Sequence, residues 1–74
     1  MERKNLKEAR RKAGMTQQQM ADKLDLNLRH YQKIEYGEIT GFFEIWDVLE
    51  DILEIHQRIL REISDNYPDK EENR

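Results

Sequence analysis

The sequence predicts a small all-α domain. Apolar residues recur at three- and four-residue spacing, capping residues stand before two of these stretches, and the three glycines stand singly at positions 14, 37 and 41. With 74 residues the chain has room for one domain, which we place at residues 1–64, followed by a polar tail at 65–74. A core of this size is marginal, so we expect a compact bundle or support from a second subunit.

The composition excludes several classes of protein. The chain has no cysteine, which excludes a disulfide framework, a thiolate nucleophile and a cysteine-ligated zinc site. No apolar run approaches the roughly 20 residues that span a bilayer, and the N-terminus does not resemble a signal peptide. We therefore expect a soluble, cytoplasmic protein that contacts no membrane.

Positive charge is concentrated in the first half of the chain. Residues 1–36 hold nine Lys or Arg against five Asp or Glu, a net charge of +4, whereas residues 37–74 hold four against eleven, a net charge of −7. Such a division is typical of a protein with one face turned toward phosphate, although unequal halves also arise by chance. The acidic half predicts salt-sensitive binding rather than tight binding to a nucleic acid.

A first helix is expected from about Glu2 or Asn5 to Ala13, with Asn5 and Glu8 as a capping pair and Gly14 as its left-handed stop. Its inward face comprises Leu6, Ala9, Arg10 and Ala13.

Two further helices follow with only a short turn between them. Thr16 caps the second helix, with Gln19 at the reciprocal capping-box position. The turn is Asp25-Leu26-Asn27, in which Asp25 is expected to be left-handed and Asn27 caps the third helix. The inward positions are Met20, Ala21, Leu24, Leu26, Tyr31 and Ile34, and Gly37 ends the third helix. A turn this short forces the two helices to cross steeply, which is the helix-turn-helix arrangement.

Residues 42–63 continue the helical pattern. The inward stripe is expected to comprise Phe42, Ile45, Trp46, Leu49, Ile52, Leu53, Ile55, Ile59, Leu60 and Ile63. One unbroken helix would be about 33 Å long, which is wide for so small a bundle, so we favour a break at Glu54-Ile55-His56. Phe43 lies off the stripe, where we expect partial burial under the preceding loop, with a role in an interface as the alternative.

The start of the third helix presents polar and basic side chains. Arg29 can donate two hydrogen bonds to one guanine, and Lys33 can reach a base or a phosphate. Leu28 can make apolar contact with a thymine methyl group. The auxiliary residues, expected to contact phosphate, are Asn27, His30 and Gln32. The alternative is an ordinary solvated face at i, i+4 spacing; the preceding helix and turn favour the DNA interpretation.

Gln17 stands at the first position of the second helix, where free N–H groups favour an anion, so its side chain and amide are predicted to seat a phosphate. Arg10 and Glu35 are charged residues on otherwise apolar faces. They are either a buried ion pair between the first and third helices or two unrelated surface charges, and periodicity does not decide between these.

Nothing in the sequence indicates catalysis or a cofactor. His30 and His56 have no neighbouring ligands that suggest a metal site, and Ser64 has no nucleophilic arrangement around it. We expect no enzyme activity, no metal, no cofactor and no small-molecule ligand.

Leu6 to Leu53 resembles the Cro and phage-repressor type of helix-turn-helix, the xenobiotic-response-element (XRE) regulators. The shared features are Leu6-x3-Arg10, Gly14-Met15-Thr16-Gln17, Met20-Ala21, Leu24, Ile34-Glu35 and Gly37. Residues 44–62 are similar to small stand-alone members found in Firmicutes and their phages. The chain departs from the family at Asp25, where Gly is commoner, and in the loop 38–43, which lacks the basic residues that often contact phosphate.

The resemblance implies a five-helix, lambda-repressor-like domain whose third helix reads the major groove of double-stranded DNA, usually as a homodimer. It implies base contacts by Leu28, Arg29 and Lys33, auxiliary contacts by Gln17, Asn27 and His30, and an ion pair between residues at the positions of Arg10 and Glu35. The leading hypothesis is a sequence-specific repressor, with helices four and five or the Phe43 region as the dimer surface. The alternative is a protein-binding module, such as an antitoxin or an antirepressor partner, that uses the acidic second half.

Overall fold

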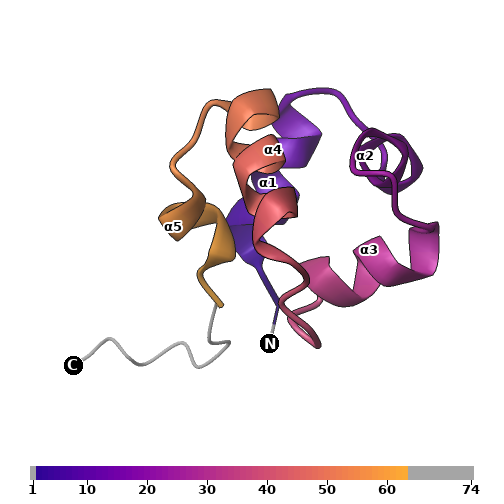
Figure 1. Ribbon diagram of the computed structural model, residues 1–74. Helices are drawn as coiled ribbons and strands as arrows, with labels where there is room; N and C mark the ends of the chain where they lie inside the picture. Colours follow the sequence, from indigo (N-terminus) through magenta and orange to yellow (C-terminus); the bar gives the residue numbers. More distant parts are fainter. Residues whose placement is uncertain (1, 64–74) are drawn as a thin grey trace.

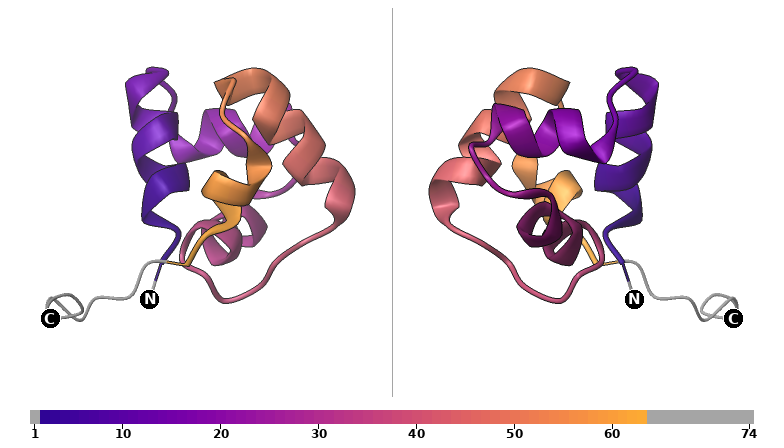
Figure 2. Two further views of the ribbon diagram at one scale, coloured as in Figure 1. Left: turned by 90° about the vertical axis from the view of Figure 1, so that its left-hand side faces the viewer. Right: turned by 90° about the vertical axis from the view of Figure 1, so that its right-hand side faces the viewer.

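The computed structural model describes residues 2–63, which form a bundle of five helices (Figures 1 and 2). The helices are α1 (Lys4–Lys12), α2 (Gln17–Lys23), α3 (Leu28–Glu35), α4 (Phe43–Leu53) and α5 (Gln57–Arg61). In Figure 1, α1, α4 and α5 form one side of the molecule, and α2 and α3 form the other. The predicted tail at residues 65–74 lies outside the described residues.

The ends of α2 and α3 are set by local side-chain chemistry, as the sequence predicts. The Thr16 hydroxyl accepts a hydrogen bond from the Gln19 N–H (3.0 Å), and the Gln19 side chain accepts one from the Thr16 N–H (2.9 Å). Asn27 accepts from the His30 N–H at 2.7 Å and so caps α3. Asp25 is left-handed, with φ at 60°. The helix-turn-helix therefore has both caps and its turn where the sequence places them.

The core joins all five helices around two large aromatic side chains, Tyr31 and Trp46. Its fully buried apolar members are Leu6, Met20, Ala21, Tyr31, Ile34, Trp46, Leu49 and Leu60. Within this core α2 packs on α3, and α5 packs on both α1 and α4. Burial of the inward face of α3 fixes which of its faces is left for a ligand.

The start and end of α1 differ from the prediction. Its N-cap is Arg3, without a side-chain cap, so the predicted Asn5–Glu8 capping pair is wrong. The Asn5 amide instead donates to the Ile59 carbonyl (3.3 Å) and to the Glu62 carboxylate (2.8 Å). Ala13 is exposed, because the helix ends one residue earlier. The capping prediction fails because the Asn5 side chain is engaged with α5 and the residue after it rather than with the main chain of α1.

The predicted break after α4 is present. Glu54 is the C-cap of α4 and adopts a left-handed conformation with φ at 57°, which turns the chain toward α5. The predicted inward stripe is partly wrong, since Ile59 and Ile63 are exposed and Phe42 is 68% exposed. Phe43 is 76% exposed, so its expected burial under the loop is also wrong. Both phenylalanines lie at the first turn of α4, where no element covers them. Ile52, Leu53 and Ile55 are half-buried against the core.

Among the described residues, no helix combines the length and the apolar character needed to cross a bilayer.

Candidate nucleic-acid interface

The turn between α2 and α3 orients α3 so that its first residues face outward. Leu24 ends α2, and the Leu26 N–H donates to the Ala21 carbonyl (2.9 Å), which closes the turn. Leu26 is half-buried against the core. Because Tyr31 and Ile34 are buried, the opposite face of α3 lies toward solvent.

That outward face carries the predicted base-contacting residues. Arg29 and Lys33 are exposed one helical turn apart, and Leu28 is half-buried outside the core cluster. A hollow of about 320 Å³ is lined by Asn27, Arg29, His30, Lys33 and Ile39. The structure thus brings four of the predicted site residues around one depression, with two exposed cations at its edge.

Gln17 and Gln32 are placed differently from their prediction as direct contacts. The Gln17 amide donates to Glu35 Oε1 at 2.8 Å, and its carbonyl oxygen accepts from the Gln32 amide at 3.1 Å. Both side chains are half-buried. They connect the start of α2 to α3 within the protein.

Arg10 and Glu35 form the ion pair that the sequence left open. Arg10 Nε lies 2.8 Å from Glu35 Oε2, and Nη2 lies 3.2 Å from Oε1. The third guanidinium nitrogen, Nη1, donates to the Met15 carbonyl at 2.8 Å. The Tyr31 hydroxyl also donates to Glu35 Oε2 at 2.7 Å. One carboxylate therefore ties together α1, α2 and α3, the three helices that build the interface.

Burial and hydrogen bonding oppose each other at Glu35. Burial raises the pKa of its carboxyl group, but the hydrogen bonds from Arg10, Tyr31 and Gln17 outweigh this and hold the pKa below its ordinary value. Burial, followed by the hydrogen bond to Glu35, raises the pKa of Tyr31. The hydrogen bond to Glu35 raises the pKa of Arg10. Glu35 and Arg10 are therefore charged at neutral pH.

Arg3 is a structural residue that the sequence analysis did not identify. It is only 5% exposed, and its guanidinium donates to the carbonyls of Arg61 (3.0 Å), Ile34 (2.6 Å) and Ile39 (3.0 Å). Its guanidinium carbon lies 5.2 Å from the centroid of the Trp46 ring. Burial, and then the like charge of Arg61, lower the pKa of Arg3. Arg3 thereby fixes the loop after α3 against α5.

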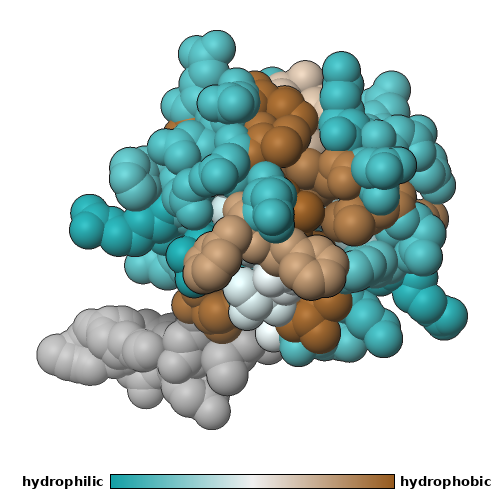
Figure 3. Space-filling model, viewed as in Figure 1, coloured by the Kyte–Doolittle hydropathy of each residue, from teal (hydrophilic) through white to brown (hydrophobic). Residues whose placement is uncertain are grey.

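An apolar patch covers part of the surface over the start of α4. The face shown in Figure 3 gathers hydrophobic atoms over α4 and the segment that precedes it. The exposed large apolar side chains of this region include Ile39, Phe42, Phe43 and Val48. Exposed apolar clusters of this kind mark interaction surfaces.

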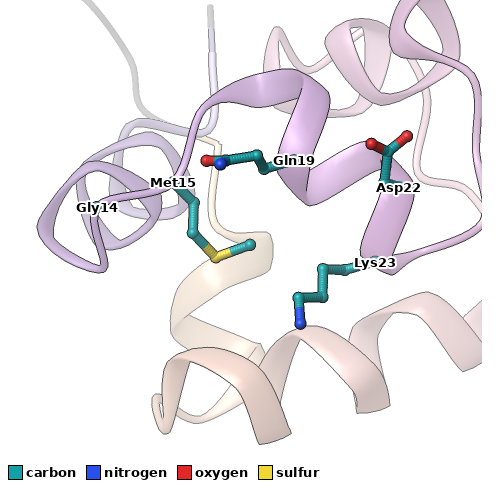
Figure 4. Close-up of a pocket in the computed structure, with 5 residues that line it drawn as sticks. All are labelled: Gly14, Met15, Gln19, Asp22 and Lys23. Atoms are coloured by element: carbon teal, nitrogen blue, oxygen red, sulfur yellow. The ribbon is translucent and has the colours of Figure 1, made fainter.

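A separate hollow of about 440 Å³ lies beside α2 and the segment that precedes it. It is lined by Gly14, Met15, Gln19, Asp22 and Lys23 (Figure 4). Met15 is half-buried and packs against the core, whereas Gln19, Asp22 and Lys23 are exposed. None of the predicted DNA-contacting residues lines this hollow.

Comparison with known proteins agrees with this geometry. The family model described as Helix-turn-helix matches residues 6–42, which is half of the chain. No curated protein and no solved structure gives a significant match. The matched residues run from α1 through α3 to the loop that follows it, so they contain all three helices that Glu35 connects. The family is one of DNA-binding regulators, which favours DNA binding over the alternative of a protein-binding module. The chain has the all-α, lambda-repressor-like fold and belongs to the Cro and phage-repressor (XRE) type of helix-turn-helix DNA-binding regulators.

Proposed function

We propose that the protein is a sequence-specific repressor that inserts the start of α3 into the major groove of its operator. The observation that carries this proposal is the single hollow bordered by Asn27, Arg29, His30 and Lys33 on the outward face of α3. An α-helix fits the major groove, and the residues at the start of such a helix contact base edges. Occupation of the operator would exclude the polymerase.

In this proposal the residues of α3 and its N-cap divide into two groups. Arg29 forms a fork to a guanine, Lys33 reaches the next base or its phosphate, and Leu28 contacts a thymine methyl group. Asn27 and His30 contact the phosphate backbone and hold the helix in register. These contacts use side chains that the structure leaves outside the core.

Gln17 and Gln32 have a modified role. The Gln17 side chain is engaged with Glu35 and Gln32, so we assign the phosphate contact at the start of α2 to the main-chain N–H of Gln17. Gln32 acts through Gln17 by holding α2 against α3. The ion pair of Arg10 with Glu35 supports the same contact, because Glu35 accepts the Gln17 amide.

We further propose that the protein acts as a homodimer, joined through the patch around Phe42 and Phe43. The two phenylalanines are the most exposed of the large apolar side chains in the described residues. A twofold dimer places two α3 helices about 34 Å apart, which matches successive major grooves. The operator is then a near-palindrome.

Selection from random duplex DNA at two salt concentrations tests this function. We expect a near-palindromic motif with half-sites about 10 base pairs apart. Arg29→Ala should relax the preference at one or two base positions, at a cost of about 1–3 kcal/mol for the specific site. Lys23→Ala, which removes an exposed cation from the end of α2, is the matched control and should leave the preference unchanged. Enrichment of the same motif by wild type and Arg29→Ala would rule out the assignment.

A further inference from the structure

A hollow lined by three arginines lies at the C-terminal end of α3. It has a volume of about 420 Å³, and its lining residues are Arg3, Thr40, Arg58, Arg61 and Glu62. Arg58 and Arg61 come from α5, and Thr40 comes from the loop after α3. Three elements distant in the sequence therefore contribute to one depression.

Within residues 2–63, no carboxylate lies within ion-pair distance of Arg3, Arg58 or Arg61. The carboxylate of Glu62 accepts a hydrogen bond from the Asn5 amide at 2.8 Å. The hollow thus gathers three positive charges against the one negative charge of Glu62, whose carboxylate is hydrogen-bonded to the side chain of Asn5.

Arg3 forms the buried wall of the hollow and still has donors to offer. It is 5% exposed, and its hydrogen bonds to main-chain carbonyls involve Nε and Nη1 alone. Within the part of the chain that the structure describes, Nη2 has no hydrogen-bonding partner. Because Arg3 lines the hollow, an anion bound there would be a further acceptor for its guanidinium.

The hollow adjoins the proposed DNA-contacting helix. Arg3 Nη1 donates to the carbonyl of Ile34 in the last turn of α3 and to that of Ile39 in the loop beyond it. A helix in the major groove has a sugar–phosphate strand on each side. The segment between Gly37 and Phe43 carries no positive charge, since Glu38 is its only ionisable residue. Lys33 lies in the last turn of α3, and Arg10 is paired with Glu35. Beyond these two, the hollow supplies further cations beside this end of the helix.

We propose that Arg58, Arg61 and Thr40, backed by Arg3, form an anion site for a phosphate of the DNA backbone beside the C-terminal end of α3. The planar fork of a guanidinium matches phosphate geometry, and a threonine hydroxyl is a common phosphate donor. This site compensates for the missing basic residues of the loop. The inference rests on the proposed placement of α3 on DNA.

The salt dependence of binding to a short mixed-sequence duplex tests the site. In the double variant Arg58→Gln/Arg61→Gln, the slope of log K against log salt should decrease in magnitude by about 0.9 for each phosphate that the variant no longer neutralises. Arg11→Gln/Lys12→Gln removes the same net charge from exposed positions at the other end of α1 from Arg3, and should change the slope by less than half as much. Equal changes in the two double variants would overturn the site.

A second variant separates the hydroxyl from the charge. Thr40→Val keeps the shape of the side chain, and the Thr40 carbonyl still accepts from the Trp46 indole N–H (2.9 Å). We expect Thr40→Val to weaken binding about two- to threefold with an unchanged slope, because the variant keeps every charge. An affinity equal to that of wild type would overturn the assignment of Thr40.

Two further results would overturn the proposal by identifying another occupant. A rise in DNA affinity in Arg58→Gln/Arg61→Gln would mean that the arginines bind the protein's own carboxylates. A loss of self-association in sedimentation without DNA, large enough to explain the weaker binding, would place the arginines in a dimer contact. The mixed-sequence duplex requires no base readout, so the site can fail while the Arg29 selection succeeds, and the converse also holds.

Discussion

Arg10 and Glu35 face each other as a two-point pair, with Nε to Oε2 at 2.8 Å and Nη2 to Oε1 at 3.2 Å. The Glu35 side chain is fully buried, and it also accepts from Tyr31 and Gln17. The carboxylate therefore depends on donors from three helices. This arrangement makes the cost of losing one partner predictable.

We expect Arg10→Met to lower the free energy of unfolding by about 3–5 kcal/mol, because a buried carboxylate loses its cation. Urea unfolding followed by circular dichroism measures this. The double variant Arg10→Met/Glu35→Leu should recover much of the loss, since it removes the unpaired charge as well. If the double variant were as unstable as the sum of the single changes, the two side chains would not be coupled.

The pKa of Glu35 predicts a loss of stability in acid. Because its folded pKa lies below the unfolded value of about 4.3, the unfolded state binds the proton first as the pH falls. The contribution is fully present above the unfolded pKa and is lost as the pH falls through the folded pKa. In Glu35→Gln, the free energy of unfolding should therefore depend less on pH across this acid range than in wild type. Glu44→Gln removes one exposed carboxylate and is the matched control.

Arg3 should contribute to stability through main-chain partners rather than through a carboxylate. Arg3→Met removes the side-chain donor to the carbonyls of Ile34, Ile39 and Arg61, of which the Ile34 carbonyl still accepts from the Gly37 N–H. We therefore expect a loss of about 2–3 kcal/mol in the free energy of unfolding. Arg3→Lys retains the positive charge above Trp46 but lacks the planar guanidinium with its several donors. Its free energy of unfolding should lie between those of wild type and Arg3→Met. A stability unchanged in Arg3→Met, measured by urea unfolding, would contradict this role.

The parts of the structure that the sequence predicts are those governed by local chemistry. Thr16 and Asn27 are capping residues followed by helical patterns, so the starts of α2 and α3 follow from a few neighbouring positions. Arg10 and Glu35 are recognisable as charges on apolar faces, and the family resemblance favours their pairing. The outward position of Arg29 and Lys33 follows from the burial of Tyr31 and Ile34.

The parts that the sequence does not predict depend on contacts between distant segments. The acceptors of Arg3 are carbonyls 31 to 58 residues away, and no local pattern encodes them. A signal is nevertheless present, because Arg3 precedes Leu6 and Arg10 by three and seven residues and shares their stripe. Gln17 is predicted to contact phosphate from its position at the start of a helix, and that position does not reveal its hydrogen bond to the distant Glu35. Phe42 is predicted to be buried from its helical spacing, but spacing does not show that no other element covers it.

The apolar patch around Phe42 and Phe43 is the surface through which we expect two copies of the chain to associate. Phe42 and Phe43 are 68% and 76% exposed, so Phe42→Ser/Phe43→Ser removes apolar surface that the folded monomer does not bury. We expect the free energy of unfolding of the monomer to change by less than about 0.5 kcal/mol for each substitution. The dimer should weaken at least about tenfold, because aromatic side chains at the centre of an interface carry much of its binding energy. Sedimentation equilibrium measures the dissociation constant of the dimer, and operator binding should become less cooperative in parallel.

Ile59→Ser, at an exposed apolar position on α5, is the control that shows which surface joins the two copies. If Ile59→Ser dissociates the dimer while the phenylalanine variant does not, the interface lies on α5 and the Phe42–Phe43 assignment is wrong.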